Sequence, residues 1–338
     1  MWLIVGVAAF FFLAIASVSD KFILSKSKIV PVSYAFYVAA LGGIVSSVLL
    51  LFNSGFKVPV GAELWWALIG AGGGFYLAIY FMYLAVRRYE ISKVNPLIVS
   101  LTPLAVLVFS LLLGLGNVGL MPMLGAGLLI LGSYCLSQVG VQRNQLDDAK
   151  AWLPIIASVV MFALSNSMSK VVYNQLDFIN AFVWIRWVSV IAAVVGTTVL
   201  GGWGEVIYQR SSQPSEWTKI YHKVASTARH YTARLVSPLF DLNAHFRQAS
   251  RRQWLVLLIG QSAGALGTIL SQYAIKLGNV FLVTALNGLQ FFFIILIMYF
   301  LTRFFPRLLK EDVHRQFMGK KILWSAVLVL GMVLIIWQ

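Results

Sequence analysis

Charged residues are scarce in this chain of 338 residues. Aspartate, glutamate, lysine and arginine make up 11% of it, 60% is apolar, and the mean hydropathy is +0.84. So few polar groups could not cover the surface of a soluble domain, which excludes that class. The apolar runs are long and continuous, unlike the alternating pattern of a membrane β-barrel. The sequence therefore predicts an all-α integral membrane protein.

Cysteine and histidine are nearly absent. Cys135 is the single cysteine, so no disulfide can form within the chain, and the four histidines show no ligand-like spacing. The sequence also lacks a set of nucleophile, histidine and acid that would indicate an intramembrane enzyme. We expect no catalytic activity, no metal site and no cofactor.

Acidic residues are missing from the middle of every apolar run. Asp20, Glu63, Glu90 and Asp177 all lie near the ends of such runs. A carboxylate relay for protons is therefore poorly supported, and facilitated transport or exchange is easier to defend. Asp20 is the one candidate for a coupling carboxylate.

Apolar runs long enough to cross a membrane occur about ten times. They lie near 2–19, 32–52, 64–85, 94–113, 118–139, 152–172, 180–201, 254–275, 279–302 and 322–337. The first has no basic segment before it and no cleavage site of small residues after it. We expect it to be retained rather than removed as a signal peptide.

Basic residues are concentrated in alternate loops. The net charge is +15, and the loops after the odd-numbered spans hold 22 lysines and arginines against 3 in the loops after the even-numbered spans. The positive-inside rule accounts for this bias better than nucleic-acid binding does. It predicts an integral protein of the cytoplasmic (inner) membrane with both termini outside.

The two halves of the chain have matching features in the same order. The first and sixth spans both end in a run of small and polar residues that closes on a lysine, Lys21 and Lys170. Each half holds five spans, so the halves would enter the membrane in opposite senses as inverted repeats. We expect one repeat over 1–140 and a second over 151–338.

These features, in this order, resemble the drug/metabolite transporter (DMT) superfamily of EamA type. The resemblance rests on the lysine endings, on Arg186 in the seventh span, on Pro103 in the fourth, and on glycine-rich fifth and tenth spans. It implies ten helices in two inverted repeats and alternating access. The chain departs from the family at Ala39, where an arginine would fall, and in the predicted side of its termini.

The segment 202–252 interrupts the second half as a basic loop. Between 215 and 236 its apolar and aromatic residues recur at helical spacing, with lysines and arginines mostly on other faces. Such a helix is expected to lie on the anionic cytoplasmic membrane surface and bind lipids. Binding of a partner, or a partly disordered linker, stays an alternative.

Arg186 is the strongest candidate for a substrate-binding residue. A charged side chain inside a membrane helix costs at least about 2.5 kcal/mol, so it should face the interior and have a partner. It could bind a substrate carboxylate or phosphate through its planar fork. The structural alternative is a fixed pairing with Asp177, with Asp20 or with a carbonyl at a helix end.

Other candidates fall into an aromatic and a polar set. Trp184 and Trp187 flank Arg186, and Tyr80 belongs to a tyrosine stripe on the third span, although aromatic packing in lipid would also explain them. The polar candidates are Thr284, Asn287 and Gln290 in the ninth span and Gln261 in the eighth. The segment 284–288 also resembles a signature of nucleotide-sugar transporters, with Gly288 in place of its final lysine.

The function that follows from this reading is a secondary transporter of a small organic solute, anionic if Arg186 is free. The alternative is a flippase for a lipid or lipid-linked precursor, which a lateral opening toward the lipid would favour. A receptor that does not transport stays open if Arg186 is locked in an ion pair. We expect no nucleic-acid partner, and the oligomeric state is left open.

Overall fold

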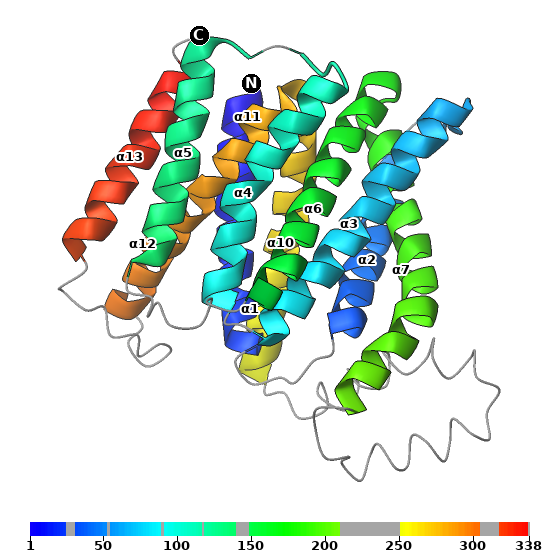
Figure 1. The fold of residues 1–338 in the computed structure, drawn as a ribbon, viewed down its shortest axis with the longest axis horizontal. Helices are drawn as coiled ribbons and strands as arrows, with labels where there is room; N and C mark the ends of the chain where they lie inside the picture. The colour runs from blue at the N-terminus through cyan, green and yellow to red at the C-terminus, as the bar shows by residue number, and fades with distance from the viewer. Residues whose placement is uncertain are drawn as a thin grey trace.

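Helices make up every element of the computed structural model, which describes residues 1–24, 31–52, 55–88, 91–116, 118–139, 149–209, 251–304 and 318–336. Within these ranges there are eleven α-helices and two 3-10 turns (Figure 1). The α-helices are α1 (Trp2–Leu24), α2 (Pro31–Leu49), α3 (Ala62–Arg88), α4 (Ile91–Leu112), α5 (Leu120–Gln138), α6 (Ala149–Gln175), α7 (Phe178–Gln209), α10 (Arg251–Leu277), α11 (Val280–Ala285), α12 (Leu289–Phe304) and α13 (Met318–Ile336), and the 3-10 turns are η1 (Leu50–Phe52) and η2 (Leu286–Gly288).

Length and composition make these the helices of an integral membrane protein. The described ranges contain six spans long and apolar enough to cross a bilayer, one of them formed by α11, η2 and α12 together, and three shorter apolar helices. A membrane span must satisfy its backbone hydrogen bonds internally, which a helix does and an irregular segment does not. The prediction of an all-α membrane protein is confirmed at this level.

The ninth expected span is interrupted, which the sequence did not predict. Instead of one helix over 279–302, α11 and α12 are joined by the 3-10 turn η2. At this turn the backbone of Gly288 lies against α5: a Cβ added there would be 2.8 Å from the Cβ of Ser133 and 3.1 Å from the carbonyl oxygen of Leu129. The turn therefore lies in a protein-packed interior, where a break in a membrane helix is tolerated.

Most helix ends lie a few residues from expectation, and the end of α7 differs most. Helix α7 continues to Gln209 instead of ending at 201, so the first residues assigned to the basic loop are helical. Helix α5 begins at Leu120 rather than 118, after a turn in which Gly114 and Gly116 have positive φ angles of 61° and 109°. Glycine adopts that backbone region without steric cost, which lets the chain reverse here.

The amphipathic helix expected over 215–236 lies outside the described residues.

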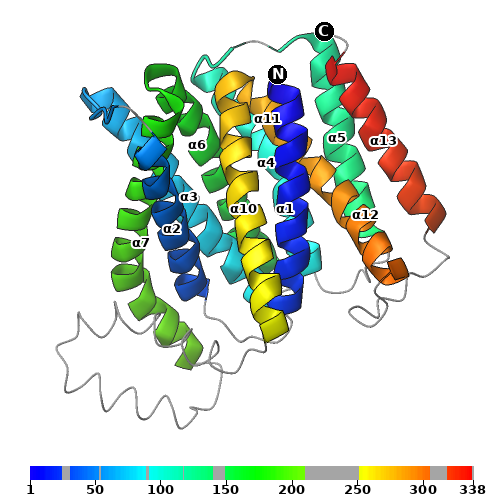
Figure 2. The same cartoon turned by 180° about the vertical axis from the view of Figure 1, so that it is seen from behind.

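Helices distant in the sequence pack side by side. The closest pairs are α1 with α10, α3 with α6, α5 with α13 and α2 with α7, while α4 packs on α6 and α12 on α1 (Figures 1 and 2). Glycines permit some of these approaches: at Gly267 of α10, an added Cβ would lie 2.9 Å from the carbonyl oxygen of Ala9 in α1. Small residues allow helix backbones to pack closely in a membrane.

Both chain termini lie at one end of the bundle, which we call the termini end (Figure 1). The ends of α6 and α10 and the start of α7 lie there too. The opposite end holds the last residues of α1, α3, α5, α7 and α12, which lead into the basic segments of the sequence. The alternation of basic and non-basic loops thus matches the two ends of the bundle.

Candidate functional site

Arg186 is a buried cation in the first part of α7. Arg186 is only 4% exposed, although a long arginine side chain usually reaches the surface. The room for it comes from α2, because a Cβ added at Gly42 would lie 3.4 Å from the Cδ atom of Arg186. A glycine on α2 therefore lets the arginine stem pass between two helices that pack closely.

Two aromatic rings hold the guanidinium group. Its central carbon lies 4.2 Å from the ring centroid of Phe75 in α3 and 5.1 Å from that of Phe182 in α7. Both distances fall within the ~6 Å range of cation–π attraction. The aromatic rings stabilise the positive charge, but they do not accept conventional hydrogen bonds from the N–H groups of the guanidinium plane. These N–H donors of Arg186 therefore stay available.

The carboxylate nearest in sequence does not pair with Arg186. Asp177 accepts hydrogen bonds from the backbone N–H (3.2 Å) and the side-chain Nδ2 (2.9 Å) of Asn180, and lies 3.9 Å from the Nζ atom of Lys57. Partial burial raises the pKa of Asp177, but these hydrogen bonds and the charge of Lys57 outweigh it, so the pKa lies below its usual value. In the described residues, Arg186 makes no hydrogen bond and no ion pair, so of the structural alternatives the pairing with Asp177 is not formed.

Trp184 faces a different part of the molecule. Its indole Nε1 donates to the carbonyl oxygen of Lys57 at 2.9 Å, and its ring packs between Phe56 and Trp65, each 5.5 Å away between centroids. Asn180 reinforces the same loop by donating to Gly55. Trp184 therefore fastens the segment between α2 and α3 to the start of α7, and it does not line a chamber around Arg186.

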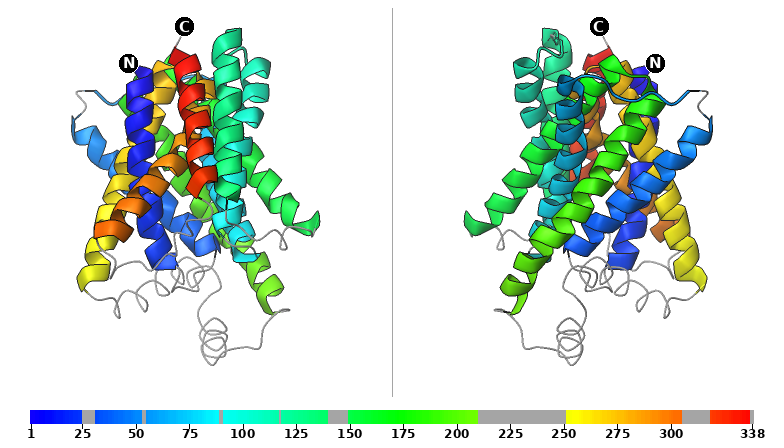
Figure 3. Two further views of the ribbon diagram at one scale, coloured as in Figure 1. Left: turned by 90° about the vertical axis from the view of Figure 1, so that its left-hand side faces the viewer. Right: turned by 90° about the vertical axis from the view of Figure 1, so that its right-hand side faces the viewer.

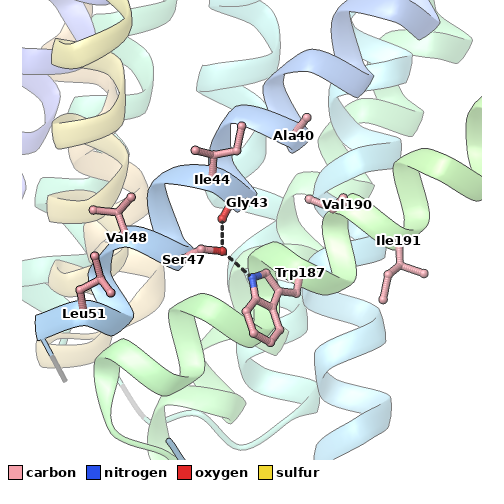
Figure 4. Close-up of a pocket in the computed structure, with 9 residues that line it drawn as sticks. All are labelled: Ala40, Gly43, Ile44, Ser47, Val48, Leu51, Trp187, Val190 and Ile191. Carbon is pink, nitrogen blue, oxygen red and sulfur yellow. Dashed lines mark hydrogen bonds between the residues drawn. The ribbon is translucent and has the colours of Figure 1, made fainter. Parts of the chain in front are cut away.

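Trp187 lines a groove between α2 and α7 on the outside of the bundle (Figure 4). Its Nε1 donates to the hydroxyl of Ser47 at 3.0 Å, and that hydroxyl donates to the carbonyl oxygen of Gly43 at 2.8 Å. The groove has a volume of about 730 Å³, and its lining consists of Ala40, Gly43, Ile44, Ser47, Val48, Leu51, Trp187, Val190 and Ile191. Its two side-chain polar groups bond to each other, so it offers a ligand apolar contact only.

The polar residues of the ninth span have separate roles. Thr284 donates to the carbonyl oxygens of Val280 and Phe281 in its own helix. The amide of Gln290 donates to the hydroxyl of Ser17 at 2.7 Å and to the carbonyl of Leu13 at 3.3 Å, which ties α12 to α1. Asn287, in the turn η2, differs: its Oδ1 atom is buried and has no partner in the part of the chain that the structure describes.

The remaining candidates are not brought to Arg186 by any hydrogen bond. Gln261 is half-buried on α10, and Tyr80 packs on α3 beside Phe81 and near the cluster of Tyr76 and Ile79. The side chain of Asp20 lies outside the described residues. The structure therefore places Arg186, Trp184, Trp187 and Asn287 in four different surroundings.

Three residues that surround Arg186 or its helix were not predicted. Phe182 could have been found, because it lies four residues before Arg186 and so on the same helix face. Phe75 and Gly42 lie on other helices, and no local pattern in the sequence connects them to Arg186. Their role depends on how α2, α3 and α7 are rotated against each other.

Comparison with known proteins gives a fold likeness alone. No family model matches this chain, and no curated protein matches it. Twenty-eight chains of solved structures match. One of them, described only as "Crystal structure of protein", is similar with a TM-score of 0.63 and 14% sequence identity, covering 99% of this chain and 96% of that chain. Likeness at that identity shows that the whole chain has the fold of a solved protein.

Proposed function

We propose that this protein is a secondary transporter that carries a small organic anion across the membrane by alternating access. One observation carries the proposal: Arg186 is a buried arginine that contacts two aromatic rings and makes no hydrogen bond or ion pair with the described residues. A charge buried in a membrane protein normally has a partner. An anionic substrate would supply the missing partner.

The chemistry of Arg186 points to a carboxylate or phosphate group on that substrate. A guanidinium group binds such groups bidentately through two parallel N–H···O bonds. The central carbon of the guanidinium group lies over the rings of Phe75 and Phe182, and none of its N–H groups donates to an acceptor in the described residues. Aromatic walls also suit the organic part of a small solute.

The pairing of helices supports two inverted repeats, over 1–140 and 151–338. If α1 to α5 correspond in order to α6, α7, α10, the interrupted helix α11–α12 and α13, the pair α1 with α10 corresponds to α6 with α3, and the pair α1 with α12 corresponds to α6 with α4. All four of these helix pairs are in contact. The pairs α5 with α13 and α2 with α7 each join two corresponding helices, so exchanging the repeats leaves them unchanged. Gly125 and Gly331 are reciprocal: an added Cβ on Gly125 would lie 2.6 Å from the carbonyl oxygen of Gly331, and one on Gly331 would lie 2.8 Å from that of Gly125.

The test compares Arg186→Met with the natural protein, both purified in detergent. Amino acids, organic anions, sugar phosphates, nucleotide sugars, quaternary amines and lipid phosphates are screened for thermal stabilisation. A ligand at 100 times its Kd adds about 2.7 kcal/mol to the free energy of unfolding. We expect one anionic class to stabilise the natural protein and to have no effect on Arg186→Met. The same ligand should be taken up by proteoliposomes that contain the natural protein only.

The unliganded variants separate a binding arginine from a structural one. Because Arg186 has no partner in the described residues, Arg186→Met should leave the free energy of unfolding unchanged or raise it. Removing one partner of a buried ion pair would instead lower it by about 3–5 kcal/mol. Arg186→Lys keeps the charge without the fork, and Trp187→Phe is the control in the outer groove. Stabilisation that survives Arg186→Met would overturn the proposal.

The groove between α2 and α7 favours a lipid flippase as the second candidate. It is lined by side chains of the outer surface, such as Ile44 at 62% and Ile191 at 62% exposure, and would open toward the lipid. Stabilisation by lipid phosphates alone, lost in Arg186→Met, would make this candidate the better one.

A further inference from the structure

Lys170 joins α6 to α10 at the termini end of the bundle. Its Nζ atom donates to three carbonyl oxygens, those of Ile275 at 3.0 Å, Lys276 at 2.9 Å and Gly278 at 2.8 Å. These carbonyls belong to the last turn of α10 and the residue after it, where a helix leaves acceptors without partners of its own. A positive charge at a helix C-terminus is stabilising as well. One side chain therefore closes the end of another helix.

Two more contacts hold the same helices together. The Tyr173 hydroxyl of α6 donates to Oε1 of Gln272 in α10 at 3.1 Å. Lys276 reaches back to the carbonyl oxygen of Leu176, just after α6, at the longer distance of 3.4 Å. We call the contacts of Lys170, Tyr173 and Lys276 the clasp.

An aromatic layer lies between the clasp and Arg186. Phe178, at the start of α7, contacts Tyr173 of α6 at 5.6 Å and Tyr273 of α10 at 5.0 Å between ring centroids. It also stacks at 5.7 Å on Phe182, whose ring contacts the guanidinium group of Arg186. Three helices thus meet directly on the side of Arg186 toward the termini end.

The same helices separate toward the opposite end. The lower parts of α6 and α7 diverge from that of α10 in both views of Figure 3. The clasp and the aromatic layer both lie where these helices converge. The contacts between the α6–α7 side and α10 are therefore concentrated at the termini end.

We propose that the clasp and the Phe178 layer form the gate that separates the Arg186 site from the termini end, and that release of Lys170 opens it. This inference rests on the proposed function, because alternating access requires each end to open in turn. Lys170 suits such a gate: its acceptors are neutral carbonyls, so opening separates no ion pair. All three of its bonds are lost together when one side chain withdraws.

The test measures the distance between α6 and α10 by double electron–electron resonance. Spin labels are placed at Asn174 and Leu277, both exposed at the ends of these helices, after Cys135→Ser removes the natural cysteine. We expect one short distance in the parent protein and a second, longer component in Lys170→Met. Tyr173→Phe keeps the ring of the aromatic layer but removes one bond of the clasp, and should give a smaller shift in the same direction.

Two lysines serve as controls. Lys57→Met removes a charge at the same end of the bundle whose side chain lies 3.9 Å from Asp177, and it should leave the distance unchanged because the three bonds of Lys170 remain. Lys21→Met removes the lysine that matches Lys170 in the first half of the sequence, and it should not lengthen the distance. The proposal is overturned if Lys170→Met and Tyr173→Phe, both with parental thermal stability, show the distance distribution of the parent. It is also overturned if Lys57→Met lengthens the distance as much as Lys170→Met does.

The measurement needs no substrate, so it separates this inference from the proposed function. A longer distance in Lys170→Met, together with no anion bound at Arg186, would support the opening of α6 from α10 and contradict anion transport. An unchanged distance with anion transport intact would contradict the gate alone.

Discussion

Arg186 and Lys170 are two cations of the helix bundle that differ in their hydrogen bonds. Lys170 directs its Nζ atom at three carbonyl oxygens, whereas the fork of Arg186 has no acceptor in the described residues. A buried group that lacks its partner costs free energy, so it persists where a ligand or a mechanism uses it. This contrast is why we propose substrate binding for Arg186 and gating for Lys170.

Asp177 is a residue whose effect on stability depends on pH. Its folded-state pKa lies below its usual value of about 4, so its contribution to folding is fully present above that value and is lost as the pH falls through the folded pKa. The effect should be below about 1 kcal/mol, because the side chain is 40% exposed and solvent screens its pair with Lys57.

Asp177→Asn tests this assignment. At pH 7 the variant should unfold at a lower temperature than the natural protein, and the difference should shrink as the pH falls from 5 toward 3. Thermal unfolding in detergent measures both series. A difference that stays constant over this range would show that Asp177 does not stabilise the fold through its charge.

The packing of helix α5 on helix α13 depends on the close approach of their backbones at Gly125 and Gly331. An added Cβ at Gly125 would lie 2.6 Å from the carbonyl oxygen of Gly331, whereas one at Gly127, half a turn away, would have nothing within 4 Å. Gly125→Ala must therefore push the helices apart, at a cost of about 1–3 kcal/mol for an overpacked site.

Gly127→Ala is the matched control in the same helix. It should leave the free energy of unfolding unchanged or raise it by about 0.5–1 kcal/mol, since alanine loses less backbone entropy than glycine. Equilibrium unfolding in mixed micelles measures both variants. Equal losses in the two would mean that helix propensity, and not the α5–α13 contact, governs this region.

For the whole molecule, the property to be tested is which side of the membrane the termini end faces. The ends of the bundle differ in charge along the sequence, and the positive-inside rule assigns the termini end to the outside of the cytoplasmic membrane. The family resemblance implies the reverse. On the charge distribution, we expect the gate of Lys170 to face outward and the Arg186 site to be reached from the cytoplasm.

Single cysteines at Lys57 and Lys150, in a Cys135→Ser background, decide between the two orientations. Lys57 contacts Asp177 and Trp184 at the start of α7, which lies at the termini end, and Lys150 is in the first turn of α6, at the opposite end. A membrane-impermeant maleimide should label position 57 in intact cells and position 150 only after permeabilisation. The opposite labelling would place the termini in the cytoplasm.

The sequence by itself determined that the chain is helical, that it belongs in a membrane and where most of its helices lie. Those properties follow from long apolar runs, because a chain in lipid must satisfy its backbone hydrogen bonds within each helix. It also identified Arg186, since a charge inside such a run is conspicuous wherever the helix packs.

What surrounds each of these residues depends on the packing of the helices in three dimensions. Trp184 and Trp187 adjoin Arg186 in sequence but turn to a loop and to an outer groove, whereas Phe75 reaches it from α3. The break at η2 likewise depends on the approach of α5 to Gly288. Neighbours across helices depend on the rotation and tilt of each helix, which are set by packing against other helices rather than by the local sequence.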